Sequence, residues 1–321
     1  MQSVPYWWSG PIGGLGNRLI AIAAVKACID KQVICFPWLN DPSCPGEYED
    51  ILDPLPNLMV RKGPSSDAVP LHTQIWEPLN IYSYLNEVFD LKLSQSDFCK
   101  RLVFELRHLP FKLELTEQAR QWRNGKGDVP MLGVHIRRTD RAAQHRNEFR
   151  EFVLRKQGLS GELPLYLSAL YGVFPSAFMQ FYEDAVLCKS IGSFKKLYSN
   201  FNYSIFSDDH QQVLGLEKTA AFFGITRQKH LTRTYFTDST KGLNGKDLRQ
   251  TDIKGALVDL LCLSQCDAIL QNNRASTFSL VASIIGATPI VTAKTHYPFW
   301  LAIEEATSLS PSHPDLSFCN L

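Results

Sequence analysis

No part of this sequence is apolar for long enough to cross a membrane. Its hydrophobic stretches fall short of the ~20 residues that a membrane helix needs. Residues Met1 to Gly10 also lack the basic region and the apolar run of a secretory signal. We therefore expect a soluble cytoplasmic chain, or a soluble domain excised from a longer one, with no membrane span.

The sequence also lacks metal-site spacing and an excess of charge of one sign. None of its eight cysteines forms a CxxC pair or has histidines at zinc-ligand spacing, and core packing explains Cys262 and Cys266 on one helix face. The 33 Lys and Arg against 32 Asp and Glu leave a net charge of +1. A sequence-independent nucleic-acid surface needs a basic face. We expect no metal, no other cofactor and no nucleic-acid partner.

The glycine-rich turn near the start lacks both common nucleotide-loop signatures. Residues 10–16 contain neither Gly-Lys-Ser/Thr nor GxGxxG spacing. A strand is predicted before this turn at residues 4–8, and a helix after it at residues 17–29. The free N–H groups and positive end of that helix suit an anion. The candidate contacts are Gly14, Gly16, Asn17 and Arg18. The alternative is that the glycines only make a tight turn.

Strands and helices alternate along most of the chain, which is typical of parallel α/β sheets. Seven prolines interrupt residues 40–94, where we assign no elements. Glycines, charges and a proline at residues 123–130 indicate a boundary. We expect one α/β domain over residues 1–125 and a second over 126–321, whose last helix can pack back on the first. Further predicted strands are 33–36, 131–136, 204–207, 268–270 and 289–292, and further helices are 113–122, 211–223, 254–264 and 277–285.

A hydrophobic strand at residues 131–136 ends in a cluster of charges. Because side chains alternate across a strand, Leu132, Val134 and Ile136 should face one side, while His135 and Arg137 face the other. Arginine matches phosphate bidentately, and open α/β sheets bind ligands at this edge. We predict an anion site here. The alternative is a solvated strand end with a local Arg–Asp pair.

Two more polar clusters follow predicted strands. Asp208 and Asp209 come after the strand at residues 204–207, where a carboxylate can accept hydrogen bonds from guanine N1–H and its exocyclic amine; the alternative is an N-cap for the next helix. Residues 276–279 precede an apolar helix, where they can cap it or bind a diphosphate. Three strand-end clusters suit a nucleotide-diphosphate cleft.

These motifs, in this order, resemble the α1,6-fucosyltransferase superfamily, which includes nodulation fucosyltransferases and, more distantly, protein O-fucosyltransferases. Residues 133–140, Gly-Val-His-Ile-Arg-Arg-Thr-Asp, resemble its HxRRxD motif. Residues 204–209 resemble its second motif, a strand ending in Ser-Asp-Asp, and residues 254–267 with 276–279 resemble its third. The turn at residues 13–18 is similar to its amino-terminal Gly-x-Gly-Asn-Gln/Arg element.

The resemblance implies a GT-B glycosyltransferase, with two Rossmann-like domains facing across a cleft. It implies inverting, metal-independent transfer of L-fucose from GDP-fucose to a glycan hydroxyl, with the first domain on the acceptor side. Arg137 would bind the β-phosphate, and His135 with Asp208 or Asp209 the guanosine. Ser276, Thr277, Phe278 and Ser279 would hold the diphosphate. Arg138 and Asp140 would shape the motif loop, with Arg138 also counted in the donor site.

The catalytic base departs from the family pattern. Where core fucosyltransferases have a glutamate a few residues after HxRRxD, this chain has His145, and Glu148 lies one helical turn beyond. Either can accept a proton, or both are solvated helix residues. Two alternatives therefore stay open: transfer from GDP-mannose or another GDP-deoxysugar, and a non-catalytic protein that binds a nucleotide sugar or a glycan.

Overall fold

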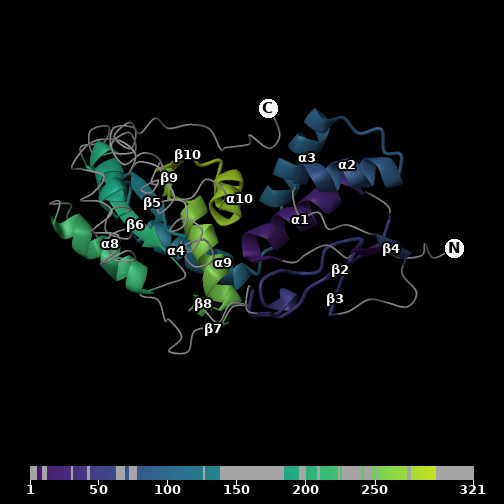
Figure 1. Ribbon diagram of the computed structural model, residues 1–321, viewed down its shortest axis with the longest axis horizontal. Helices are drawn as coiled ribbons and strands as arrows, with labels where there is room; N and C mark the ends of the chain where they lie inside the picture. Colours follow the sequence, from purple (N-terminus) through teal and green to yellow (C-terminus); the bar gives the residue numbers. More distant parts are fainter. Residues whose placement is uncertain are drawn as a thin grey trace, which may run out of the picture.

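The computed structural model describes two four-stranded parallel sheets with helices packed around them (Figure 1). The described residues are 6–8, 13–29, 32–41, 44–62, 69–71, 78–125, 127–137, 184–194, 200–207, 210–222, 225, 240–241, 247–249, 252–272 and 276–293. The predicted α/β class with parallel strands is confirmed.

The first sheet has the strand order β3-β2-β1-β4, and all its pairs are parallel. Its strands are β1 (Tyr6–Trp8), β2 (Ile34–Pro37), β3 (Leu58–Arg61) and β4 (Val69–Leu71). The helices of this half are α1 (Leu15–Cys28), α2 (Pro78–Val88), α3 (Gln95–Arg107) and α4 (Leu113–Asn124), with a short 3-10 helix at Tyr48–Asp50.

Four described elements of this half lie in the proline-rich segment at residues 40–94, to which the sequence pattern assigned none. They are the 3-10 helix, β3, β4 and α2, and α3 follows this segment. Pro70 lies in β4, an edge strand, where a missing N–H is tolerated. Pro78 is the first residue of α2, where its fixed φ suits a helix start. These two prolines therefore lie within regular elements, at positions that tolerate proline, and do not indicate a loop.

The second sheet has the strand order β10-β9-β5-β6 and is also parallel. Its strands are β5 (Met131–His135), β6 (Asn202–Phe206), β9 (Ala268–Gln271) and β10 (Ile290–Thr292). Its helices are α8 (His210–Phe222), α9 (Ile253–Ser264), α10 (Thr277–Gly286) and a helical segment at residues 184–194. An antiparallel pair, β7 (Thr240–Lys241) and β8 (Asp247–Arg249), completes the described elements.

Strand β5 lies inside this sheet, and its two faces pack against different helices. Leu132, Val134 and Ile136 belong to a core cluster that includes residues of the segment 184–194 and of α8. Gly133 faces α9, where an added Cβ would lie 2.4 Å from Cδ1 of Leu263. The predicted alternation is therefore confirmed, and glycine allows α9 to approach the sheet closely.

One hydrophobic core connects the two halves of the chain. It contains buried residues of α1 to α4 together with residues of α9 and α10. Helix α10 packs against α1 and α3, and α9 packs against α4 (Figure 1). Because helices of the two halves share this core, the core does not itself separate two domains. The boundary between residues 125 and 126 stays a prediction. The segment expected to hold the last helix lies outside the described residues.

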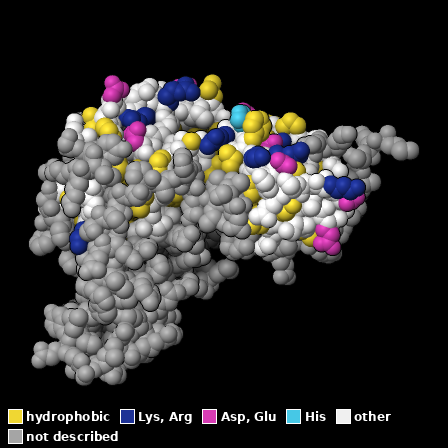
Figure 2. All heavy atoms as spheres, turned by 90° about the horizontal axis from the view of Figure 1, so that it is seen from above, with side chains coloured by type: hydrophobic (Ala, Val, Ile, Leu, Met, Phe, Trp, Pro, Cys, Tyr) yellow, Lys and Arg dark blue, Asp and Glu magenta, His cyan; other side chains and the backbone are white. Residues whose placement is uncertain are grey.

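Large hydrophobic side chains are seldom exposed in the described part of the chain. The exposed ones are Leu39, Met59, Val88, Phe104 and Leu113. On the face seen in Figure 2, the described hydrophobic side chains are interspersed with Lys, Arg, Asp and Glu. Such mixing of hydrophobic and charged side chains is ordinary for a protein surface.

Candidate functional site

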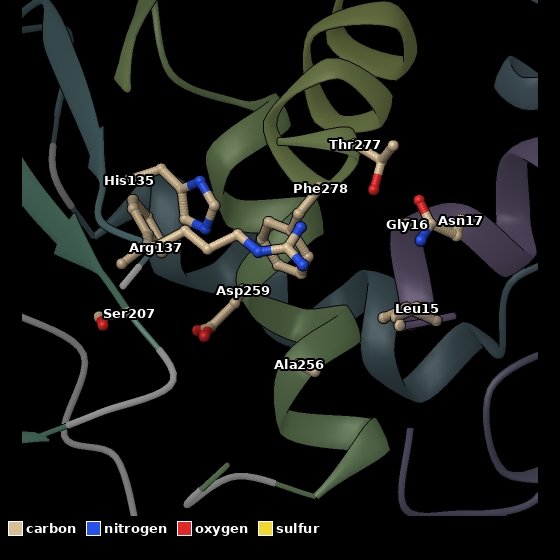
Figure 3. Close-up of a pocket in the computed structure, with 12 residues that line it drawn as sticks. Leu15, Gly16, Asn17, His135, Arg137, Ser207, Ala256, Asp259, Thr277 and Phe278 are labelled. Atoms are coloured by element: carbon tan, nitrogen blue, oxygen red, sulfur yellow. The ribbon is translucent and has the colours of Figure 1, made fainter. Parts of the chain in front are cut away.

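A pocket lies where the carboxyl ends of β5 and β6 meet the first turns of α1 and α10 (Figure 3). Residues of α9 line another side of it. This is the edge at which open α/β sheets bind ligands. The lining residues are Gly14, Leu15, Gly16, Asn17, His135, Arg137, Phe206, Ser207, Ala256, Asp259, Thr277 and Phe278.

The two helices present uncapped N-termini to this pocket. Gly14 is the N-cap of α1 and Ser276 that of α10, and neither makes a side-chain cap hydrogen bond. Neither helix has an acidic residue in its first turn. First-turn N–H groups have no carbonyl partner within the helix, and each helix end carries about half a positive charge. An anion in the pocket would be stabilised by both ends.

Gly16 is the point at which the two helix ends touch. A Cβ added there would lie 2.7 Å from the backbone nitrogen of Phe278 and 2.8 Å from the carbonyl carbon of Thr277. Both are backbone atoms, which cannot move aside by changing a rotamer. Glycine at this position therefore allows α1 and α10 to meet, and the predicted turn residues Gly14, Gly16 and Asn17 all line the pocket.

His135 and Arg137 reach the same pocket, as their alternation along the strand predicted. His135 is 7% exposed, and its imidazole stacks on Phe278 with ring centroids 5.0 Å apart. Its Nδ1 lies 2.5 Å from Oγ of Ser279 and 3.4 Å from Oγ of Ser276. These contacts hold the ring against the first turn of α10.

The side chain of Asn272 anchors the backbone of Arg137, and Arg137 lines the pocket. Its N–H donates to Oδ1 of Asn272 at 2.9 Å, and its carbonyl accepts from Nδ2 of Asn272 at 3.2 Å. Asn272 directly follows β9, so this amide joins the ends of two adjacent strands. In Figure 3 the guanidinium extends from β5 toward Phe278.

Asp259 is a pocket residue that the sequence motifs did not identify. It lies in α9 with Ala256, lines the pocket and is 6% exposed. Buried carboxylates are rare in proteins unless they are paired or functional. The sequence carries a signal for it, since this aspartate interrupts an apolar run within the helix.

Arg18 does not line the pocket, although it was grouped with the residues that contact the anion. Its guanidinium bonds to the carbonyls of Gly13 at 2.8 Å and Leu39 at 2.7 Å, and it pairs with Asp41 at 2.8 Å. It also lies over Trp38, 4.8 Å from the ring centroid, and is 1% exposed. This arginine therefore holds the loop after β2 against α1.

The four residues at the start of α10 divide into two pairs. Thr277 and Phe278 line the pocket, whereas Ser276 and Ser279 are 1% and 0% exposed and contact His135 instead. The remaining predicted site residues lie outside the described residues. They are Arg138, Asp140, His145, Glu148, Asp208 and Asp209.

The described cysteines belong to the core, as expected, and supply no nucleophile. All seven are buried, and none of them forms a disulfide with another described cysteine. Burial raises the pKa of the Cys28 and Cys188 thiols to about 12, so both are protonated at neutral pH. Within the described residues, no group of three or more His, Cys, Asp or Glu side chains could hold a metal ion, and no helix could span a membrane.

No protein-family model and no curated protein matches this sequence. Among solved structures, fucosyltransferase NodZ from Bradyrhizobium has a TM-score of 0.48 at 14% identity, covering 92% of this chain and 98% of that one. POFUT1 in complex with GDP-fucose has a TM-score of 0.46 at 10% identity, covering 90% and 97%. Arabidopsis thaliana FUT1 in complex with GDP has a TM-score of 0.40 at 10% identity, covering 92% and 72%. Because the sequence identities and the TM-scores are low, the function proposed for this chain is argued from its own geometry.

The contact at Gly16 predicts opposite outcomes for two glycine substitutions. Gly16→Ala should lower the free energy of unfolding by about 1–3 kcal/mol, because its Cβ would meet the backbone of α10. Gly192→Ala is the control, since an added Cβ in that helical segment meets nothing within 4 Å, and it should be neutral or raise stability by about 0.5–1 kcal/mol. Urea unfolding measures both. Equal stability of Gly16→Ala and the wild type would contradict the close approach.

Proposed function

We propose that this protein is a GT-B glycosyltransferase that transfers L-fucose from GDP-fucose to a glycan hydroxyl, with inversion and without a metal. The observation that carries this proposal is the convergence of Arg137 and the uncapped N-termini of α1 and α10 on one pocket. The two halves of the chain thus contribute positive charge to the same place. A diphosphate is the ligand that best matches such an arrangement.

The same groups suit the chemistry of glycosyl transfer. As the bond between the sugar and GDP breaks, negative charge develops on the β-phosphate. The guanidinium of Arg137 and the preorganised N–H groups of the two helices can stabilise that charge as it forms. They also provide the neutralisation that a divalent cation provides in other transferases, so the proposed mechanism needs no metal.

Asp259 and His135 are the described residues best suited to the nucleoside. A carboxylate accepts hydrogen bonds from guanine N1–H and its exocyclic amine, and it has acceptor sites for more than one partner. Asp259 supplies such a group inside the pocket, on the α9 side. We therefore add Asp259 to Asp208 and Asp209 as a candidate for reading the base.

The acceptor half of the reaction is proposed on sequence grounds alone. A departing fucosyl group resembles an oxocarbenium ion, so the attacking hydroxyl needs only weak base assistance. His145 and Glu148 stay the candidates for that base. We place the glycan acceptor on the side of the first domain.

The first prediction from the proposed function tests the contact between Arg137 and the β-phosphate, apart from the contacts to the rest of the nucleotide. Wild-type protein should bind GDP more tightly than GMP, and Arg137→Ala should weaken GDP binding about 10- to 100-fold while changing GMP binding much less, because a charged hydrogen bond to the β-phosphate is lost. Isothermal titration calorimetry measures all four affinities. Arg120→Ala is the control, since Arg120 is an exposed helix residue paired with Glu117. Equal losses for GDP and GMP would refute the β-phosphate assignment.

The second prediction concerns the base. Asp259→Asn should reduce the preference for GDP over IDP about 10-fold, because inosine lacks the exocyclic amine and an amide cannot accept with both of its polar atoms. Glu117→Gln, which removes an exposed helix carboxylate, should leave the preference unchanged. Thermal unfolding of each variant controls for loss of structure. An unaltered GDP to IDP ratio in Asp259→Asn would remove Asp259 from base recognition.

The third prediction tests the reaction itself. GDP release in the presence of mixed glycan acceptors should be faster with GDP-fucose than with GDP-mannose, and it should be unchanged by EDTA. Faster GDP release with GDP-mannose would show that GDP-mannose, and not GDP-fucose, is the preferred donor. Tight GDP binding without turnover on any acceptor would favour a non-catalytic protein that binds nucleotide sugars, and loss of turnover with EDTA would contradict metal independence.

A further inference from the structure

Ser279 is a buried residue that lies beside the pocket and contacts His135. It lies in the first turn of α10, is 0% exposed and does not line the pocket. Its hydroxyl oxygen lies 2.5 Å from Nδ1 of His135, whose ring does line the pocket. Ser279 therefore contacts a pocket residue without reaching the pocket itself.

The direction of this hydrogen bond follows from the burial of the hydroxyl. Other buried helix hydroxyls in the described part of the chain donate to carbonyls, as Ser190 does to Val186 and Ser283 to Thr288. Among the described residues, the hydrogen-bond partner of the Ser279 hydroxyl is Nδ1 of His135 alone. A buried O–H without an acceptor is costly, so the Ser279 hydroxyl donates and Nδ1 accepts.

An imidazole that accepts at Nδ1 carries its proton on Nε2 when it is neutral. Stacking on Phe278, at an interplanar angle of 23°, holds the ring in this orientation. In Figure 3 the second ring nitrogen points away from α10, toward the side chain of Arg137. The contact from Ser276 reaches the same Nδ1 at 3.4 Å, a longer distance, so Ser279 is the principal hydrogen-bond partner of this nitrogen.

We propose that Ser279 is a positioning residue of the donor site: by donating to Nδ1, it holds His135 as the Nε2–H tautomer and makes the ring a hydrogen-bond donor to an oxygen of bound GDP. The part of this inference that concerns GDP rests on the proposed function. The part that concerns the tautomer rests on the geometry of His135 and Ser279 alone.

The tautomer can be measured without a nucleotide. In protein labelled with 15N-histidine, the ring nitrogens of His135 should show the pattern of an Nε2–H imidazole, and Ser279→Ala should shift them toward a mixture of tautomers. Ser279→Thr keeps the hydroxyl and should restore the wild-type pattern. An Nδ1–H pattern in the wild type, or no change in Ser279→Ala, would overturn the assignment.

The link to binding is tested by a double-mutant cycle on the affinity for GDP. Ser279→Ala should weaken GDP binding about 5-fold, the size of one hydrogen bond. In a His135→Ala background it should have no further effect, because Ser279 acts through that ring. Ser283→Ala removes an equally buried hydroxyl of α10 and should leave binding unchanged.

A loss from Ser279→Ala that adds to that of His135→Ala would overturn the positioning role, as would an equal loss from Ser283→Ala. A wild-type protein that binds no GDP would overturn the proposed function and the ligand named here. The 15N pattern would still decide the tautomer, so the two failures are distinguishable.

Discussion

The backbone contact between the first turns of α1 and α10 is the constraint on which the site depends. At Gly16 the two helices approach so closely that a single added carbon would meet the backbone at Thr277 and Phe278. This contact sets the distance between the two helix ends, and it brings residues from opposite halves of the chain to one pocket. It also places α10 against α1 and α3, which extends one core through both sheets. The pocket is therefore a product of packing between the two halves of the chain.

The two helix N-termini that meet at the pocket repel each other electrostatically, and the positive potential that results attracts anions. Two positive helix ends repel each other when they face a common space, and Arg137 adds a full positive charge to that space. Asp259 is the described carboxylate that offsets part of this potential from within the pocket. Its single charge leaves an excess of positive potential, which an anionic ligand can neutralise. The stability gained elsewhere in the core thus maintains a positively charged pocket, the property on which the proposed diphosphate site depends.

The strand and helix pattern of the second sheet was predictable because its elements are apolar and clearly bounded, as β5 and α9 show. The first sheet was only partly predictable, since Pro70 and Pro78 resemble loop signals although an edge strand and a helix start tolerate them. Within the site, alternation along β5 correctly placed His135 and Arg137. The sequence shows Asp259 as an aspartate within an apolar run, but only the packing of α9 places that carboxylate at the pocket. Arg18 turns away from the pocket toward Leu39 and Asp41, a direction that the sequence does not show.

Arg18 and its partners show how the first half of the chain also shapes the site indirectly. Arg18 holds the loop after β2, and within that loop Nε1 of Trp38 donates to the carbonyl of Gly46 at 3.0 Å. The neighbouring carbonyl of Pro45 accepts from the N–H of Ile253, the first residue of α9, at 3.2 Å. Because α9 carries Asp259, the same loop fixes where that carboxylate enters the pocket. The first half of the chain therefore shapes the pocket in two ways, directly through the N-terminus of α1 and indirectly through its contact with α9.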